Sequence, residues 1–173
     1  MLLTADHVRL MARYNAWQNA QIVRALDQVS LGVLTEDHGA HFGTILGTLN
    51  HVLWADRLWL HRFGTGEPCP EDGIGESTAL TATGAAWSAA RFAVDGRITL
   101  WAKRLRSLDL TGDLAWYSGA TGMEMTRPVA VCVTHMFNHQ THHRGQVHAM
   151  LTRVGLDAPV TDLVFMPSEE ATP

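Results

Sequence analysis

Residues 132–154, CVTHMFNHQTHHRGQVHAMLTRV, carry the pattern that decides the fold. Side chains that suit a core recur there at steps of four and three, the spacing that returns a residue to the same face of an α-helix. This seam consists of Cys132, Met136, His139, His143, Val147, Met150 and Val154. Pro128 is suited to the first position of the helix, and Gly155 is suited to ending it. The stretch therefore predicts one long helix with a face in a core.

Three more stretches with the same helical period are residues 4–29, residues 40–63 and a run from Trp87 to Leu108. Gly96 weakens the third run, which we still expect to form one helix. Between the second and third runs, residues 64–77 are rich in Gly, Pro and acidic side chains, which is typical of a long surface loop. Residues 110–126 alternate over short stretches, which predicts a small hairpin or an ordered loop before the last helix. The sequence thus predicts an all-α fold, a four-helix bundle.

Composition sets limits on the class of protein. The chain has 173 residues, of which 46% are hydrophobic and 17% charged, with a net charge of −4. These values are typical of a soluble globular protein, and we expect residues 1–173 to form a single domain. Lys and Arg are not clustered as a phosphate backbone or an anionic membrane would require, so we expect no nucleic acid and no membrane as partner. Cys69 and Cys132 belong to no CxxC pair, and no signal peptide or membrane span is evident, which favours a cytoplasmic protein.

Histidines are the candidate functional residues of the predicted bundle. Five of the ten histidines fall on the last predicted helix, and two of them, His139 and His143, lie on its seam. Residues four apart are separated by only about 40° around a helix, so both imidazoles can reach one ion. The best third candidate is His51, which lies beside the apolar stripe of the second helix. The small residues Gly47 and Ala55, one turn before and one turn after it, would leave room for a ligand.

Three neutral imidazoles with vacant coordination positions are the ligand set of a catalytic first-row metal site. A single histidine on an apolar face is nevertheless more often a hydrogen-bonded core residue than a ligand. HxxxH pairs on helices also occur by chance. The residues alone therefore leave a metal site and ordinary core histidines as alternatives.

Residues 134–166, THMFNHQTHHRGQVHAMLTRVGLDAPVTDLVFM, resemble the signature of the DinB/YfiT-like superfamily of metalloenzymes, in which an HxxxHRGQ segment ends the last helix. Residues 43–60, GTILGTLNHVLWADRLWL, resemble its second helix with a single metal histidine, and residues 14–26, YNAWQNAQIVRAL, resemble its first helix. Carried over position by position, the metal ligands of the superfamily fall on His51, His139 and His143.

The resemblance implies an up-down-down-up four-helix bundle, usually a homodimer, that binds a divalent metal such as zinc or nickel. It also implies an enzyme like the bacillithiol S-transferases and mycothiol-dependent isomerases, in which the metal presents a low-molecular-weight thiol as thiolate to an electrophile. We therefore expect a metal-dependent S-transferase, or a hydrolase that activates water, with a small-molecule thiol or electrophile as partner. The alternative is a non-catalytic metal-binding or stress-response bundle in which the metal is structural.

Other polar residues are assigned weaker roles. Asp56 and Tyr14 are candidates for an acid–base group or a hydrogen-bond donor at the cavity. His135, one turn before His139, fits a fourth ligand, a proton relay or a core histidine, of which we favour the last. Gln146 is a candidate for supporting a ligand.

Two further assignments concern residues next to the proposed site. Arg144 points away from His143, because successive helical residues diverge by about 100°, and we expect it to brace the bundle or the dimer through an ion pair. Trp116 and Tyr117 lie in the irregular segment before the last helix, where they are candidates for a wall of the substrate pocket.

Overall fold

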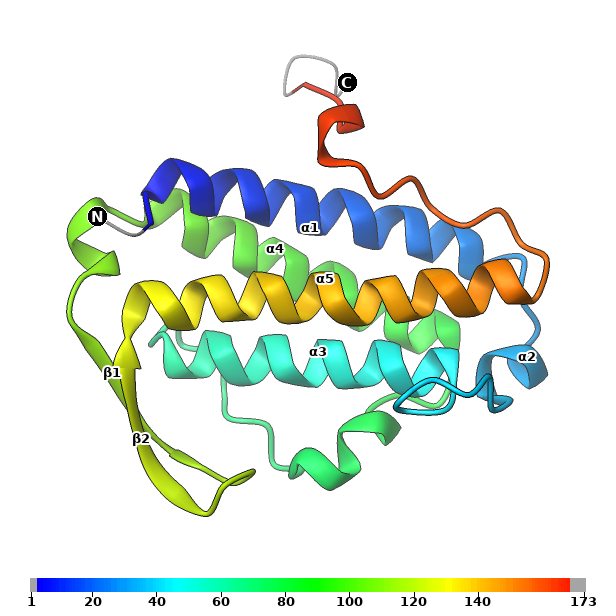
Figure 1. Cartoon of the computed structure of the whole chain (residues 1–173), viewed down its shortest axis with the longest axis horizontal. Helices are drawn as coiled ribbons and strands as arrows, with labels where there is room; N and C mark the ends of the chain where they lie inside the picture. Colours follow the sequence, from blue (N-terminus) through cyan, green and yellow to red (C-terminus); the bar gives the residue numbers. More distant parts are fainter. Residues whose placement is uncertain (1–2, 169–173) are drawn as a thin grey trace.

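Four long helices lie side by side along the longest axis of the molecule in the computed structural model, which describes residues 3–168 (Figure 1). They are α1 (Ala5–Leu26), α3 (Ile45–Arg62), α4 (Gly84–Arg104) and α5 (Val129–Arg153). Followed from blue to red, α1 and α5 run in one direction, and α3 and α4 run in the opposite direction. This up-down-down-up order confirms the fold expected from the sequence. The short helices are α2 (Leu31–Thr35), η1 (Ile74–Ala79), η2 (Ser107–Leu110) and η3 (Leu163–Phe165).

The ends of the long helices follow local capping rules. Three of them begin after a threonine whose hydroxyl accepts a hydrogen bond from a backbone N–H in the first turn: Thr4, Thr44 and Thr83. α3 and α5 are each followed closely by a glycine with positive φ, Gly64 at 69° and Gly155 at 79°. The sequence suggested that Pro128 is the first helical residue of α5. Pro128 instead immediately precedes this helix.

Two helix boundaries differ most from the prediction. α3 begins at Ile45 and not at residue 40, because residues 40–43 form a tight turn with Gly43 at a φ of 69°. α4 continues through Gly96 as expected but ends at Arg104. Leu108 lies beyond this end in η2 and is 72% exposed. The apolar spacing in the sequence therefore continues past the end of the helix.

The core lies between two helix pairs, because α1 packs mainly on α4 and α3 mainly on α5. Most of the predicted seam of α5 is buried, namely Cys132, Met136, His143, Val147 and Met150. Trp87 of α4 is 1% exposed, and its Nε1–H donates a hydrogen bond of 3.0 Å to the carbonyl of Leu49 in α3. α3 and α4 are therefore joined by a polar contact inside the apolar core.

Because α3 and α4 run in the same direction, the chain between them, residues 63–83, must return along the bundle (Figure 1). We call it the crossover segment. It is more than the surface loop that its composition indicated, since it contains η1 and two buried residues, Glu67 and Ser77. Side chains of α3 satisfy its carbonyl groups: the Asn50 amide donates to two of them at 2.9 Å, and the Trp54 indole donates to a third at 2.9 Å.

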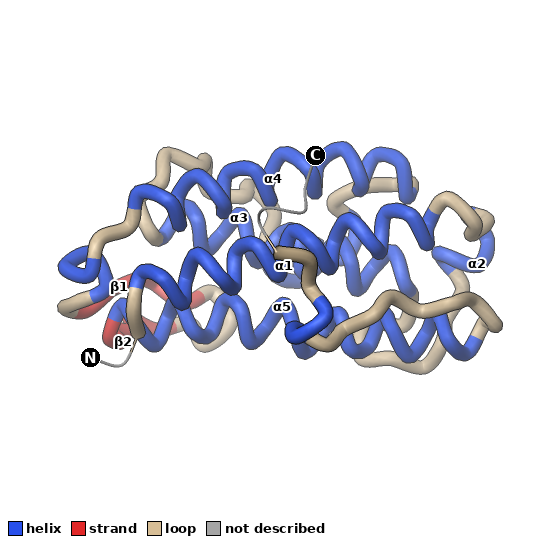
Figure 2. Tube along the Cα trace, turned by 90° about the horizontal axis from the view of Figure 1, so that it is seen from above, coloured by secondary structure: helices blue, strands red, loops and turns tan. Residues whose placement is uncertain are grey.

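Strands β1 (Asp113–Ser118) and β2 (Met123–Pro128) form an antiparallel hairpin directly before α5, which confirms the hairpin prediction. After α5 the chain runs back over α1 (Figure 2), where the Tyr14 hydroxyl donates a hydrogen bond of 2.5 Å to the carbonyl of Thr161. None of the helices within residues 3–168 has the length and apolar character needed to cross a membrane.

Candidate metal centre

His51 of α3 and His139 and His143 of α5 meet between these two helices. One ring nitrogen from each lies within 4.8 Å of the other two, and Nε2 of His51 is 3.2 Å from Nε2 of His139. His51 and His143 are 4% and 6% exposed, and His139 is half-buried. The structure thus brings together the three residues that the sequence singled out. We call them the histidine cluster.

A serine of the crossover segment determines the protonation of His51. The Ser77 hydroxyl donates its hydrogen to the carbonyl of Ile74 at 2.7 Å and lies 2.9 Å from Nδ1 of His51. Since a hydroxyl has one hydrogen, Ser77 must accept the second hydrogen bond, and Nδ1 of His51 must carry the proton. Nε2 of His51 therefore presents a lone pair to the other two histidines.

His143 is oriented in the same way by a residue one turn later on α5. The side-chain carbonyl of Gln146 accepts a hydrogen bond of 2.8 Å from Nδ1 of His143, which leaves Nε2 unprotonated. Gln146 thus lies where the sequence placed it, next to a candidate ligand. Within residues 3–168, Nδ1 of His139 makes no hydrogen bond, so its proton can sit on either ring nitrogen.

All three imidazoles are neutral at physiological pH. Burial lowers the pKa of His51 to about 4, assisted by the nearby His143 and His41, and lowers that of His139 to about 3, assisted first by His143 and His51. Burial also lowers the pKa of His143, although its hydrogen bond to Gln146 opposes the shift. A cluster that excludes protons in this way presents lone pairs, the form of imidazole that binds metals.

The donor set fits a divalent first-row cation. Two imidazoles have Nδ1 hydrogen-bonded, which leaves Nε2 as the atom available to a metal, the usual arrangement of histidine ligands and their partners. Nitrogen ligands suit zinc, nickel, cobalt and copper better than magnesium or calcium, which prefer oxygen. Three ligands are one fewer than a closed tetrahedral site would have. His51, His139 and His143 would therefore hold the ion and leave a position for a small molecule.

Aromatic side chains surround the cluster. The ring centroid of Phe42, in the turn before α3, is 4.1 Å from that of His51 and 5.4 Å from that of His143. We expected Gly47 to leave room for a ligand, but the space beside it is filled. A Cβ at this position would lie 2.8 Å from the Thr44 hydroxyl and 3.3 Å from the Phe42 carbonyl. The absence of a side chain at Gly47 instead allows the capped turn to pack closely against α3.

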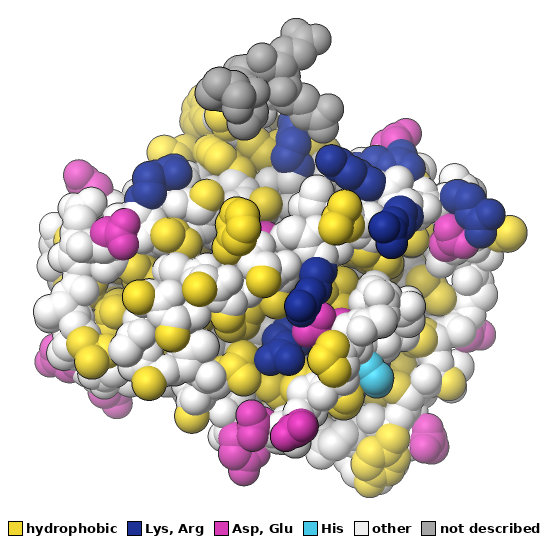
Figure 3. Space-filling view, turned by 180° about the vertical axis from the view of Figure 1, so that it is seen from behind, with side chains coloured by type: hydrophobic (Ala, Val, Ile, Leu, Met, Phe, Trp, Pro, Cys, Tyr) yellow, Lys and Arg dark blue, Asp and Glu magenta, His cyan; other side chains and the backbone are white. Residues whose placement is uncertain are grey.

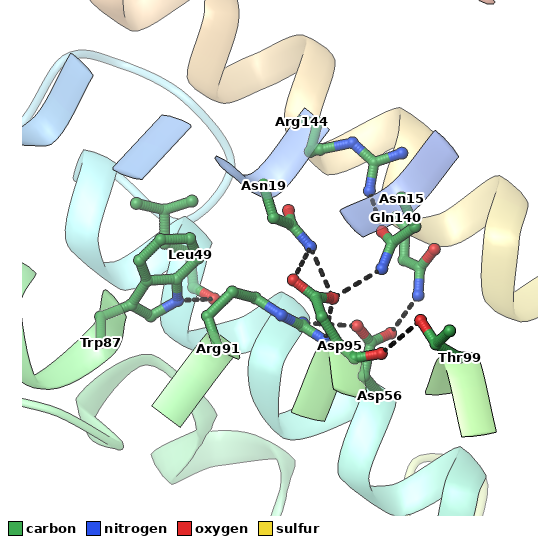
Figure 4. A network of polar contacts seen from close by, with 10 residues as sticks. All are labelled: Asn15, Asn19, Leu49, Asp56, Trp87, Arg91, Asp95, Thr99, Gln140 and Arg144. Carbon is green, nitrogen blue, oxygen red and sulfur yellow. Dashed lines mark hydrogen bonds and ion pairs between the residues drawn. The ribbon is translucent and has the colours of Figure 1, made fainter. Parts of the chain in front are cut away.

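A separate buried polar network includes residues of all four long helices (Figure 4). Its centre is Arg91, 1% exposed, which forms ion pairs with Asp56 at 2.6 Å and with Asp95 at 2.9 Å. Burial lowers the pKa of Arg91, but the two carboxylates outweigh this effect and raise it. Gln140, the residue after His139, donates to Asp56 at 2.8 Å, which anchors α5 beside the candidate ligands.

Arg144, the residue after His143, is also buried and belongs to this network, as Figure 4 shows. Its guanidinium donates to the side-chain carbonyl of Asn15 and lies 5.6 Å from the ring centroid of Tyr14. These contacts brace α5 against α1, although by a hydrogen bond and a cation–π contact and not by the expected ion pair. Burial lowers the pKa of Arg144 to about 10, so it stays charged at neutral pH.

The other candidates from the sequence lie outside the cluster. Asp56 is occupied by Arg91 and Gln140, and the Tyr14 hydroxyl donates to the chain beyond α5, so neither placement supports an acid–base role. His135 is exposed and not the core histidine that we favoured, because it lies about 100° around α5 from the fully buried Met136. Its ring centroid is 5.7 Å from that of His139.

The strand alternation of β1 separates Trp116 from Tyr117. Trp116 is half-buried, and its ring centroid lies 5.6 Å from that of Trp59 on α3. Tyr117 is 62% exposed on the opposite face of the strand, so the structure does not bring it toward the cluster. Sequence reasoning missed Ser77, which belongs to no spacing pattern, and Phe42, which it assigned to the start of the second helix and not to a turn.

Two surface hollows lie outside the histidine cluster. One of about 580 Å³ is bordered by His135 and His7, between α5 and the start of α1. A larger one of about 900 Å³ is lined only by residues of α1 and α4, which include Phe92 and Leu100, so it contains no residue of the cluster. The face seen from behind in Figure 3 has apolar side chains distributed among charged ones.

The fold and the cluster define a four-helix-bundle protein with a buried three-histidine site. The DinB family pattern matches residues 1–172, and the chain belongs to the DinB family. It is 24% identical to Protein DinB of Bacillus subtilis (strain 168) over an alignment of 167 residues, and the match covers 91% of this chain and 92% of that protein.

Two solved structures are similar in fold. A DinB-like protein of Bacillus cereus ATCC 10987 matches with a TM-score of 0.68 and 19% identity, over 92% of this chain and 99% of that one. YfiT of Bacillus subtilis, described as a probable metal-dependent hydrolase with an unusual four-helix bundle topology, matches with a TM-score of 0.66 and 15% identity, over 90% and 91% of the two chains. At these identities the likeness concerns the fold.

Proposed function

We propose that this protein is a divalent-metal-dependent enzyme whose histidine cluster holds zinc or nickel and binds a low-molecular-weight thiol for transfer to an electrophile. The observation that carries the proposal is the cluster itself. It consists of three neutral imidazoles, two buried and one half-buried, of which His51 is oriented by Ser77 and His143 by Gln146, and no fourth protein ligand is present among residues 3–168. A divalent cation held there would lower the pKa of a coordinated thiol or water and so supply a nucleophile near neutral pH.

The surroundings of the cluster favour a thiol over water. Imidazoles are neutral, so they leave the charge of the cation uncompensated and favour an anionic ligand, either a thiolate or a hydroxide. A hydrolase commonly also needs a general base beside the attacking water. Within residues 3–168 no carboxylate hydrogen-bonds a cluster histidine, and Asp56 is committed to Arg91 and Gln140.

The second candidate is the hydrolase, and YfiT supports it by fold and by its description as a probable metal-dependent hydrolase. The same three histidines would serve both reactions, since thiol and water would bind in the same place. The two candidates predict different substrates for one site. Thiol transfer requires an added thiol, whereas hydrolysis does not.

The test is a thiol-transfer assay on purified protein loaded with zinc or nickel, with glutathione, cysteine or bacillithiol as thiol and monobromobimane as electrophile. We expect the wild type to exceed the uncatalysed rate and His143→Ala to lose at least about 100-fold, because the ion loses one of three ligands. His148→Ala removes a histidine on the same helix that lies outside the cluster, and it should retain the rate. Equal rates for wild type and His143→Ala would refute the proposal.

A purely structural ion, the alternative raised from the sequence, gives a different result. Its removal would lower the melting temperature, because metal binding that involves two helices contributes to folding. The spectrum of the cobalt-substituted protein would then not respond to added thiol. A thiol-dependent change in that spectrum, lost in His143→Ala, supports the enzyme.

A further inference from the structure

Arg62, the last residue of α3, is held between two indole rings. Its guanidinium carbon lies 4.7 Å from the ring centroid of Trp59, one turn earlier on α3, and 5.3 Å from that of Trp116 on the hairpin. The two indoles meet edge to face, with centroids 5.6 Å apart. Stacking on aromatic rings fixes the plane of a guanidinium while leaving its N–H groups at the ring edges. Arg62 is therefore positioned by aromatic contacts from two separate elements.

No acceptor within residues 3–168 uses these N–H groups, since Arg62 takes part in no hydrogen bond or ion pair there. Arginines that pair with carboxylates within residues 3–168 include Arg9, Arg57, Arg91, Arg97 and Arg106. Arg62 is half-buried, and burial lowers its pKa. The ordinary pKa of an arginine is so high that the guanidinium nevertheless stays charged. A fixed, half-buried cation with unused donors is suited to an anionic ligand.

Arg62 lies on the side of the helix pair that carries the histidine cluster. The ring centroid of Trp59 is 5.2 Å from that of His135, which in turn is 5.7 Å from that of His139. Side chains on a helix lean toward its N-terminus, and the guanidinium accordingly lies over Trp59, at a level eight residues after His51. At 1.5 Å per residue, this level is about 12 Å along α3 from the cluster.

We propose that Arg62 binds a carboxylate of the substrate whose thiol is held at the histidine cluster, so that the substrate is an elongated mercapto acid with about 12 Å between its two functional groups. The inference rests on the proposed function, because the cluster is taken as the thiol site. It adds a substrate class: both ends of the ligand are anionic when bound, and each end meets a positive centre. Arg62 is a specificity residue here, since it contacts the substrate away from the reacting sulfur.

The test measures binding and not turnover. Cobalt-loaded protein is titrated with mercaptopropionate, mercaptohexanoate and mercaptooctanoate, and with the mercapto-alcohols of the same chain lengths. Ligation is followed by the thiolate-to-cobalt charge-transfer band. We expect the acid to bind about tenfold more tightly than the alcohol at the longest chain length, because a charge-assisted pair forms only when the chain reaches Arg62. For mercaptopropionate the ratio should be close to one.

Variants of Arg62 and its surroundings provide the decisive comparison. Arg62→Met should bring the ratio for mercaptooctanoate to about one while leaving alcohol binding unchanged. Trp116→Leu, which removes one ring from the exposed hairpin, should lower the ratio in part and serves if Arg62→Met is poorly folded. Arg104→Met, which removes an exposed arginine of α4, is the matched control and should retain the wild-type ratio.

The outcomes separate this inference from the proposed function. A charge-transfer band with equal affinities for acids and alcohols, or a preference for acids that survives in Arg62→Met, would overturn the role of Arg62 and leave the thiol site standing. Absence of the band for every probe would overturn both.

Discussion

Replacing Arg91 by methionine removes the only cation that pairs directly with Asp56 and Asp95 in the part of the chain that the structure describes. The Arg91 and Asp56 side chains are both 1% exposed, so water cannot take over the role of the guanidinium. Breaking a buried ion pair in this way costs about 3–5 kcal/mol. That is a large part of the roughly 5–15 kcal/mol by which domains are stable. For a chain of this length the melting temperature should fall by about 6–20 °C.

The loss can be measured by urea unfolding followed by circular dichroism, with calorimetry for the melting temperature. Arg106→Met is the control, because Arg106 is 77% exposed in its ion pair with Asp109 and its removal should cost much less than that of Arg91. Adding Asp56→Asn to Arg91→Met should recover part of the loss, since the amide carries no charge and can still accept the hydrogen bond from Gln140.

The penalty should also depend on pH. Burial raises the pKa of Asp56, and in Arg91→Met no paired guanidinium opposes this shift. A carboxyl group with a higher pKa in the folded than in the unfolded chain favours folding at low pH and loses that contribution as the pH rises. The deficit of Arg91→Met should therefore shrink as the pH falls from about 7 toward about 4. Equal losses for Arg91→Met and Arg106→Met, or a deficit unchanged by pH and by Asp56→Asn, would refute the description of a dry, charged network.

Three further predictions concern the cluster and its surroundings. Ser77→Ala removes the acceptor for Nδ1 of His51, and zinc affinity measured against a competing chelator should fall about 10–100-fold, whereas Ser88→Ala on α4 should leave it unchanged. Burial holds the pKa of two cluster imidazoles at about 4 and about 3, so zinc affinity should fall by no more than about tenfold between pH 7.5 and pH 5.5. Three imidazoles of ordinary pKa would lose about 1000-fold over that range, and a loss of that size would show that the site is hydrated. Gly47→Ala should cost about 1–3 kcal/mol in urea unfolding, because its Cβ would lie 2.8 Å from the capping threonine hydroxyl. Gly96→Ala, with no atom within 4 Å, should instead stabilise α4 by up to about 1 kcal/mol, and equal effects of the two substitutions would contradict the packing argument.

Periodic and local signals predicted much of the architecture. The seam on α5 identified a buried face, and the same spacing brought His139 and His143 to one side of the helix. Gly64 and Gly155 ended their helices as expected because positive φ is a property of the residue and its immediate neighbours. The order of the four helices, in contrast, came from family resemblance, since loop lengths alone allow several topologies.

Contacts between distant segments were not accessible from the sequence. Ser77 is separated from His51 by 26 residues and lies in a stretch whose composition indicates a surface loop, yet it is fully buried. The space beside Gly47 was filled by the turn before α3, whose residues the sequence assigned to the helix itself. His135 shares the four-residue spacing of the seam but lies next to it and not on it, because each step of four adds about 40° of rotation.

The parallel course of α3 and α4 makes the state of His51 depend on local unfolding. Two helices that run the same way need a long connection, and that connection supplies the serine that keeps the His51 proton on Nδ1. Opening the crossover segment alone would leave all three histidines on their helices, but it would free His51 to change tautomer and to hydrate. The free energy of that partial opening, which is smaller than that of global unfolding, therefore sets how long the candidate metal centre stays organised. A cut or a fluctuation in residues 63–83 would act on the chemistry of the bundle without disturbing its helices.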